Sequence, residues 1–222
     1  MGKPGLAAEF HCWYAQNRGE ALRKGEFLHA LYGKYLRTGS VVDLGCGEGA
    51  LLLWLQQQGR NHLLGIESNP ELSRLARSFG VPIKEADFLE YLQTAHPQPA
   101  DYFYLDVVEH VPFESNMRLF GLLPVGSRLI IQTPYTCSVQ GHEYYLKVPS
   151  HVAPYSPWVL EKMLTRFGYT TVEQGSIGGN LRSTWKNRLR AYLIRKVLGV
   201  DPELLMGGGN FFIVADRVRE NG

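Results

Sequence analysis

One short segment constrains the fold more than any other. The residues Val41-Val-Asp-Leu-Gly-Cys-Gly-Glu-Gly49 are typical of a buried strand that runs into a glycine turn and then a helix. Glycines are needed there if a ligand approaches the backbone closely, because a Cβ would obstruct it. The Gly-x-Gly-x-Gly spacing is neither the dinucleotide fingerprint nor a phosphate loop. Because Asp43 and Glu48 make the turn acidic, it suits a cationic ligand better than a pyrophosphate.

Strand-length apolar runs alternate with helix-length amphipathic runs from this segment onwards. Strands are expected at residues 41–44, 63–67, 82–85, 102–107, 128–132, 170–174 and 211–216. Helices are expected at residues 50–58, 71–79, 88–93, 115–123 and 157–167. This order is typical of a parallel sheet covered on both faces, so we expect a doubly wound, Rossmann-like α/β fold.

Length and composition set the broad class. A chain of 222 residues with 45% hydrophobic residues is long enough for one large core and is not disordered or fibrous. Its longest purely apolar run, residues 50–55, is far shorter than the roughly 20 residues of a spanning helix. No secretory pattern opens the chain, and Cys12, Cys46 and Cys137 lack paired spacing. We expect one cytoplasmic domain over residues 1–222 with free thiols.

Three segments fall outside the alternation and are expected to carry structure or function of their own. They are a helical leader over residues 1–38, an insertion over residues 134–156, and a second insertion over residues 178–209. Within the last, residues 181–200 hold six basic and no acidic side chains, and as a helix they would be amphipathic. This pattern indicates contact with a membrane surface or an anionic partner, or else a helix packed on the domain with a solvated cationic face.

Acidic residues follow the predicted strands at the edge where open α/β sheets bind ligands. Glu67 ends the second strand, where a carboxylate can accept hydrogen bonds from both hydroxyls of a ribose. Asp87 could accept from an exocyclic amine or cap the next helix, and Phe88 could lie against a purine. The fourth strand ends in Asp106-Val-Val-Glu-His110. These positions predict a nucleoside site at the carboxyl edge of the sheet.

Together these residues resemble the class I S-adenosylmethionine-dependent methyltransferases, nearest to the group with the ubiquinone-biosynthesis O-methyltransferases and many sugar and natural-product methyltransferases. The resemblance rests on Asp43-Leu-Gly-Cys-Gly-Glu-Gly49, Glu67, Asp87 and residues 106–110, and covers roughly residues 39–174 plus the last strand. It implies a seven-stranded sheet with helices on both faces, whose last strand inserts antiparallel between the fifth and sixth. It also implies S-adenosyl-L-methionine as methyl donor and S-adenosyl-L-homocysteine as product.

The resemblance further implies which residues bind the donor. They are Tyr14, Asp43, Gly45, Cys46, Gly47, Gly49, Glu67, Ser68, Asp87, Phe88, Asp106 and Val107. The glycines would wrap the methionine part, Glu67 would hold the ribose, and Asp87 with Phe88 would contact the adenine. Asp106 and Val107 would line the donor near its sulfonium. The leader would fold over the donor as a lid and bring Tyr14 to the sulfonium, unless Tyr14 only anchors a helix.

The acceptor pocket of this group is built between the fifth strand and the next helix, here residues 134–156. Tyrosines and histidines are frequent in this segment and could bind a polyhydroxylated acceptor or a flat ring, or simply pack the loop. A base is needed only if the acceptor is a hydroxyl, and the candidates on predicted loops are His110, His142 and His151. A metal site from His142, Glu143 and His151 has no standard spacing, so no metal is expected.

The predicted function is O-methylation of a sugar, glycan or small hydroxylated metabolite by in-line methyl transfer. N-methylation of an amino sugar or small amine is the alternative within the enzyme class. A catalytically inactive nucleoside-binding protein is the alternative outside it, whereas the glycine spacing disfavours a nicotinamide oxidoreductase. The expected partners are a small-molecule or saccharide acceptor and, through residues 181–200, a membrane surface or anionic molecule. Nucleic acid is not expected, because no recognised RNA or DNA module accompanies the one basic helix and the rest of the chain is net negative.

Overall fold

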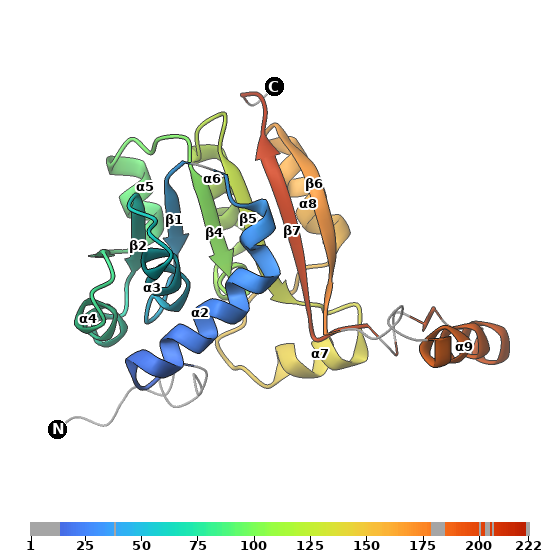
Figure 1. Ribbon diagram of the computed structural model, residues 1–222. Coiled ribbons are helices and arrows are strands. Elements are labelled where there is room, and N and C mark those ends of the chain that lie inside the picture. The colour runs from blue at the N-terminus through green and yellow to red at the C-terminus, as the bar shows by residue number, and fades with distance from the viewer. Residues whose placement is uncertain are drawn as a thin grey trace.

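A seven-stranded sheet forms the centre of the computed structural model, which describes residues 14–37, 39–178, 185–199, 201–202, 205 and 207–220. The strand order is β3-β2-β1-β4-β5-β7-β6 (Figure 1), and β7 runs antiparallel to both of its neighbours. The strands are β1 (Val41–Leu44), β2 (Leu63–Glu67), β3 (Ile83–Glu85), β4 (Asp101–Leu105), β5 (Arg128–Pro134), β6 (Tyr169–Ile177) and β7 (Asn210–Arg217). The expected Rossmann-like fold, with its displaced antiparallel last strand, is confirmed.

Helices cover both faces of this sheet. One face carries α2 (Arg18–Tyr32), α3 (Ala50–Gln57) and α4 (Pro70–Ser78), and the other carries α5 (Phe88–Thr94), α6 (Phe113–Leu122) and α8 (Pro157–Arg166). Further helical segments are η1 (Gly33–Tyr35), η2 (Val108–His110), α7 (Val139–Leu146), α9 (Trp185–Leu193) and η3 (Ile194–Leu198). The predicted helices and strands agree with the structure to within three residues at each end.

Alternation along the central strands places a core on each side of the sheet. On β4, Tyr102 and Tyr104 enter the core beneath α5, α6 and α8, whereas Phe103 enters the opposite core beneath α2 and α3. Strands that are covered on both faces need apolar side chains on both faces, which explains their continuous apolar runs. The two cores hold the carboxyl ends of β1, β2, β4 and β5 in fixed positions, and the candidate site lies there.

The described part of the leader packs firmly on the domain. Asn17 caps α2 by accepting the Glu20 N–H at 3.0 Å. Gly25 lets α2 approach α3, because a Cβ there would overlap the Ala50 carbonyl oxygen and lie 2.7 Å from Trp54 Cβ. Residues 1–13, which include Cys12 and the start of the predicted lid, lie outside the described part of the chain. What is described is therefore an anchored helix that carries Tyr14 toward the glycine turn.

The second insertion contains a helix that stands apart from the sheet (Figure 1). None of the residues of α9 is buried, so the interpretation of a helix packed on the domain does not hold for the described residues. Positions 179–184 and 200, which belong to the predicted helix or its approach, lie outside them. Among the described helices, none is both long enough and apolar enough to cross a membrane.

Candidate active site

The glycine turn has the backbone shape that its sequence predicts. Gly45, Gly47 and Gly49 have φ values of 73°, 57° and 73°, which lie in the left-handed region that favours glycine. A Cβ on Gly45 would lie 2.7 Å from Val107 Cγ2, and one on Gly47 would lie 2.9 Å from Tyr14 Cε1. The turn therefore brings two predicted donor residues, Tyr14 from the leader and Val107 from the end of β4, into one place.

Glu67 joins the end of β2 to this turn. Its Oε2 accepts the Gly47 N–H at 2.8 Å, and its Oε1 accepts the Asn69 N–H at 2.8 Å. Each carboxylate oxygen keeps a further lone pair, so two ribose hydroxyls could donate to it without displacing these bonds. The next residue, Ser68, is exposed. The geometry is compatible with the predicted ribose site.

Glu48 serves the leader rather than a ligand. Its side chain is fully buried, and its Oε1 accepts from Lys24 Nζ at 2.8 Å and from the Ala15 N–H at 3.3 Å. Because Lys24 neutralises Glu48, the turn is less acidic toward a ligand than the sequence indicates. The ion pair instead fixes α2 and Tyr14 over the turn.

Asp43 lies buried below the turn, with 6% of its surface exposed. Burial raises the pKa of Asp43 to about 7, the charges of Glu67 and Glu48 add to the rise, and Lys24 opposes it. Burial, and then Asp43, also raises the pKa of the Cys46 thiol well above its ordinary value. A thiol of this kind stays protonated and unreactive, so Cys46 lines the turn without acting as a nucleophile.

Asp106 is one of two described residues other than glycine with a positive φ, here 54°. This conformation ends β4 earlier than predicted and turns the side chain toward β5, where Oδ2 accepts from Gln132 Nε2 at 2.7 Å. Gln132 Oε1 in turn accepts a short hydrogen bond from the Tyr32 hydroxyl of α2. Asp106 keeps exposed surface. Desolvation of its carboxyl by neighbouring protein atoms raises its pKa above the ordinary value, although the hydrogen bond from Gln132 and the charge of Lys24 oppose this rise. Such backbone outliers cluster at functional sites.

The two predicted adenine contacts have structural partners. Asp87 Oδ1 accepts the Glu90 N–H at 2.9 Å and caps α5, so the capping interpretation is confirmed. Phe88 packs edge-on against Tyr104, with ring centroids 5.5 Å apart. The adenine contacts of Asp87 and Phe88 stay predictions.

A polar cluster lies directly beside Asp106. The rings of His110 and His151 are 4.6 Å apart, and His151 Nε2 is 3.9 Å from Glu109 Oε1. Glu109 is 1% exposed, and its Oε2 accepts from Thr133 Oγ1 at 2.9 Å. Burial and the Asp106 charge raise the pKa of Glu109 well above its ordinary value. We call Glu109, His110 and His151 the edge cluster.

The sequence prediction included Glu109 in the segment 106–110 but assigned it no role of its own. An acid that immediately precedes a candidate histidine, at the end of a buried strand, was the available signal. The third candidate histidine, His142, lies elsewhere: it is exposed on α7, a helix that the sequence pattern did not predict. Glu143, which follows His142 in the sequence, pairs with Lys147 at 2.7 Å.

The tyrosines of residues 134–156 divide into two pairs. Tyr135 and Tyr155 are buried, and the Tyr155 hydroxyl accepts from Asn116 Nδ2 at 2.8 Å, so for these two the packing interpretation is correct. Tyr144 and Tyr145 are only half-buried. The Tyr145 ring lies against His151, with centroids 4.9 Å apart, which places one aromatic face at the edge cluster.

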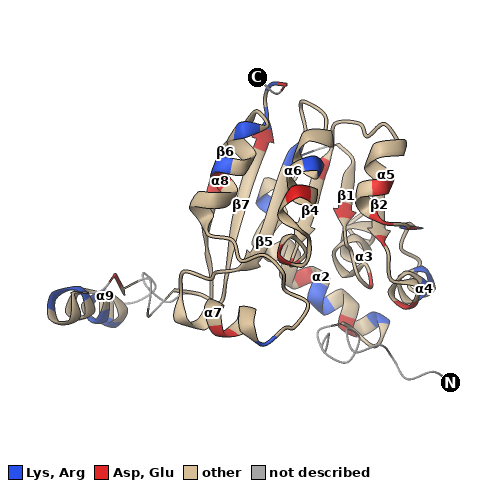
Figure 2. Ribbon diagram, turned by 180° about the vertical axis from the view of Figure 1, so that it is seen from behind, with Lys and Arg blue, Asp and Glu red and all other residues tan. Residues whose placement is uncertain are grey.

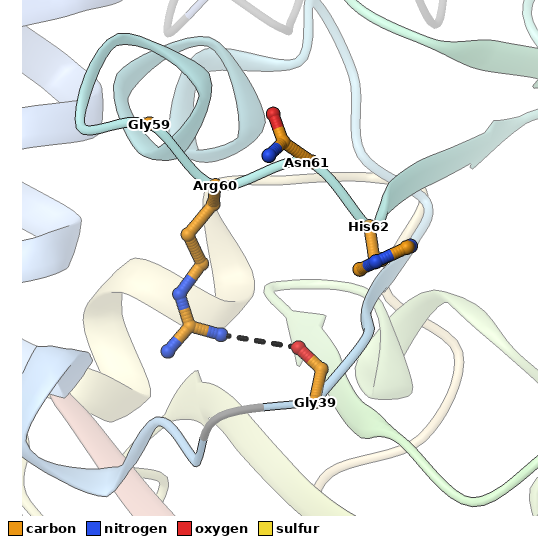
Figure 3. Close-up of a pocket in the computed structure, with 5 residues that line it drawn as sticks. All are labelled: Gly39, Gly59, Arg60, Asn61 and His62. Atoms are coloured by element: carbon orange, nitrogen blue, oxygen red, sulfur yellow. Dashed lines mark hydrogen bonds between the residues drawn. The ribbon is translucent and has the colours of Figure 1, made fainter.

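The described part of the surface includes two open hollows. The first, of about 570 Å³, is lined by Thr136, Ser138, Val139, His142, Glu143 and Leu146, all from the predicted acceptor segment. The second, of about 310 Å³ (Figure 3), lies between Gly39 and residues 59–62, where Arg60 Nη1 donates to the Gly39 carbonyl at 3.3 Å. It lies at the amino ends of β1 and β2, opposite the glycine turn, so we assign it no catalytic role.

The family model for a methyltransferase domain matches residues 14–174. The chain belongs to this family. The matched segment runs from Tyr14 to the sixth strand and so includes the glycine turn, Glu67 and the edge cluster. No curated protein matches the chain in sequence.

Solved methyltransferase structures share the fold of this family member. A SAM-dependent methyltransferase from Archaeoglobus fulgidus has a TM-score of 0.72 and 21% identity over 89% of this chain and 96% of the other. Geranyl diphosphate C-methyltransferase from Streptomyces coelicolor was solved with Mg²⁺, geranyl diphosphate and S-adenosyl-L-homocysteine. It has a TM-score of 0.60 and 14% identity over 93% of this chain and 84% of the other. Magnesium protoporphyrin IX methyltransferase from Synechocystis, solved with bound SAM, has a TM-score of 0.55 and 15% identity over 98% of this chain and 86% of the other.

Proposed function

We propose that this methyltransferase moves a methyl group from S-adenosylmethionine to a hydroxyl oxygen of a small polyhydroxylated or saccharide acceptor. Structural neighbours bind S-adenosylmethionine or its product on the same fold. The donor would bind in a site lined by the twelve residues predicted for it. Its ribose would bind to Glu67, and its sulfonium would lie between Tyr14 and Asp106. The Gly47 and Gly45 contacts with Tyr14 and Val107 support this placement.

The edge cluster is the observation that carries the choice of a hydroxyl acceptor. A hydroxyl must lose its proton to become a nucleophile, whereas a neutral amine attacks through a lone pair that it already has. Glu109 is buried and His151 is half-buried, both carry groups that can accept a proton or bind a cation, and Glu109 lies near Asp106 at the predicted methyl end of the donor. The aromatic face of Tyr145 beside His151 suits a sugar ring.

The transfer itself is a displacement in line. A lone pair of the acceptor oxygen forms the new O–C bond, the C–S bonding pair returns to sulfur, and the sulfonium becomes a neutral thioether. The protein mainly holds oxygen and methyl carbon at near-attack distance. The anchored leader would exclude water from the donor through Tyr14, and the edge cluster would promote loss of the proton from the acceptor hydroxyl.

Two measurements test this proposal. Calorimetric titration with S-adenosylmethionine, S-adenosylhomocysteine and NADH should show binding of both sulfur nucleosides and no response to NADH. Methyl-labelled donor should then be offered to sugars, small phenols, amino sugars and amines, with mass spectrometry to locate the label. Methyl ethers support the proposal, while labelled nitrogen alone would assign N-methylation. Binding of neither nucleoside would contradict the donor assignment itself.

We infer in addition that α9 contacts an anionic membrane surface. Its residues and those of η3 expose both large apolar and basic side chains, and residues 185–199 contain no acid. The exposed apolar side chains are Trp185, Leu189, Tyr192, Leu193, Val197 and Leu198. Figure 2 shows the basic residues of α9 away from the mixed charges of the sheet domain. Charge complementarity with anionic headgroups favours this partner.

A further inference from the structure

The edge cluster brings together the ligands of a metal site. Among the described residues, Glu109, His110 and His151 each offer one ligand atom, and these atoms lie within 4.8 Å of one another. The cluster joins two segments that are far apart in sequence. Their backbones are tied independently of any ion, because the Glu109 carbonyl accepts the N–H groups of Val152 at 2.8 Å and Ala153 at 3.1 Å.

Both imidazoles are oriented by backbone carbonyls. His151 Nδ1 lies 2.7 Å from the Tyr145 oxygen, and His110 Nδ1 lies 3.2 Å from the Ser150 oxygen. A carbonyl only accepts, so each neutral ring donates from Nδ1 and carries its lone pair on Nε2. Metal-binding histidines characteristically donate their other N–H to a carbonyl or carboxylate in this way, which fixes the ring and its tautomer.

The Glu109 carboxylate is also oriented by a hydrogen bond from the protein. Thr133 donates to Glu109 Oε2 and leaves Oε1 directed toward His151 Nε2. Their separation of 3.9 Å is too long for a hydrogen bond. Ligand atoms around one ion, each at about 2.1 Å, lie roughly 3 Å apart, so a modest closure of the cluster would complete the site.

We propose that Glu109, His110 and His151 bind one divalent transition-metal ion that holds the acceptor hydroxyl beside the methyl donor. Two imidazoles and one carboxylate favour Mn²⁺, Fe²⁺, Co²⁺ or Zn²⁺ over Mg²⁺ or Ca²⁺, which prefer oxygen ligands. Three protein ligands leave coordination positions for a substrate oxygen. The placement of the acceptor rests on the proposed function, whereas the ion site rests on the geometry of the cluster alone.

The ion supplies Lewis-acid chemistry to the transfer. Coordination of the acceptor oxygen lowers the pKa of the hydroxyl, and its proton passes to solvent water. The oxygen lone pair then forms the bond to the methyl carbon, while the C–S pair leaves with the sulfur. His110 and His151 act here as ligands rather than as bases. His142, on α7, takes no part.

Direct ion binding tests this proposal without any substrate. Full-length protein freed of metal with EDTA is titrated with Mn²⁺ and Zn²⁺ by calorimetry, and Co²⁺ absorption reports on imidazole ligands. We expect one ion per chain and a loss of affinity of roughly 100-fold or more in His151→Ala and Glu109→Gln. Thr133→Val should lose roughly 10-fold, because it removes only an orienting bond. His62→Ala, at the opposite edge of the sheet, and His142→Ala should bind like the wild type.

The outcomes separate this proposal from the proposed function. Absence of binding of all three ions, or equal binding by His151→Ala and wild type, would overturn the metal site even if methyl transfer is found. Binding that is lost only in cluster variants with unchanged unfolding temperatures supports the site, whatever the donor titration shows. Should His151→Ala fail to fold, the Co²⁺ spectra of wild type and Thr133→Val decide the question in its place.

Discussion

The Glu67 carboxylate accepts the backbone N–H of Gly47 at 2.8 Å. This bond links the end of β2 to the middle of the glycine turn, across 20 residues of sequence. The same carboxylate is the predicted ribose acceptor, so it has two tasks. It shapes the turn, and in the proposed donor complex its remaining lone pairs would accept hydrogen bonds from the ribose hydroxyls. The ribose and methionine parts of the proposed donor site would then be coupled through one side chain.

Replacement of Glu67 by glutamine should separate these tasks. The amide keeps one acceptor oxygen but loses the charge and half of the accepting capacity, so affinity for S-adenosylhomocysteine should fall by roughly 10-fold or more. Calorimetric titration of Glu67→Gln and wild type measures this loss. The unfolding temperature should change by only a few degrees. Unchanged affinity in a folded variant would show that the ribose assignment is wrong.

Gly47→Val should abolish donor binding by two routes. Its φ of 57° is costly for a β-branched residue, and the new side chain would meet Tyr14 Cε1. We expect donor affinity to be lower in Gly47→Ala than in the wild type and to be lost in Gly47→Val. Gly59→Ala is the matched control, since Gly59 also has a positive φ, 83°, but open space around it. If both alanine variants bind the donor equally well, the contact with Tyr14 has no role.

The sequence predicted the sheet better than the site, for a physical reason. Strand and helix periodicity reports burial, and both cores depend on it, so the pattern predicted β7 as a strand, while the family resemblance supplied its antiparallel place between β5 and β6. The site depends on contacts between segments that periodicity does not report. The ion pair of Glu48 with Lys24 and the burial of Tyr155 each occupy a residue that sequence position alone made available to a ligand.

Contacts between segments also explain why Glu109 was assigned no role and why His142 was proposed as a base. Glu109 belongs to the edge cluster through its contacts with Thr133 on β5 and His151 before α8. Neither neighbour is apparent from the sequence around Glu109. His142 was grouped with His151 because both lie in one insertion. The helix α7, begun by the Ser138 cap on the Gly141 N–H at 3.0 Å, places His142 outside the edge cluster.

Asp43 should make the stability of the unliganded protein depend on pH. Its pKa rises from 3.8 to about 7 on folding, so between these values the folded state holds a proton that the unfolded state releases. Stability should therefore fall as the pH rises from about 4 to 7 and then level off. Asp43→Asn should remove a large part of this fall, on the order of a few kcal/mol. Urea unfolding of both proteins at pH 5 and pH 8 measures it. Parallel curves would show that Asp43 keeps an ordinary pKa.

Gly25→Ala should destabilise the protein although alanine favours helices. The new Cβ would overlap the Ala50 carbonyl oxygen, so α2 would have to move away from α3 at a cost of about 1–3 kcal/mol. In thermal unfolding this corresponds to a loss of roughly 2–12 °C. Gly19→Ala is the matched control on the same helix, because its Cβ would have no neighbour nearer than 3.4 Å. The control should match or exceed the wild type, and an equal loss in both variants would refute the packing argument.

Removal of the apolar and basic side chains of α9 should abolish binding to anionic vesicles. Wild-type protein should sediment with vesicles that contain phosphatidylserine but not with pure phosphatidylcholine, and salt should weaken the binding because surface charges are screened. Trp185→Ser and Arg188→Ala with Arg190→Ala should each reduce it severalfold. Trp158→Ser is the matched control, since Trp158 on α8 is 65% exposed and Trp185 is 70% exposed. Equal sedimentation of the two tryptophan variants would contradict membrane binding through α9. Concentration-dependent dimers that need Trp185 would instead identify a second copy of the chain as the partner of α9.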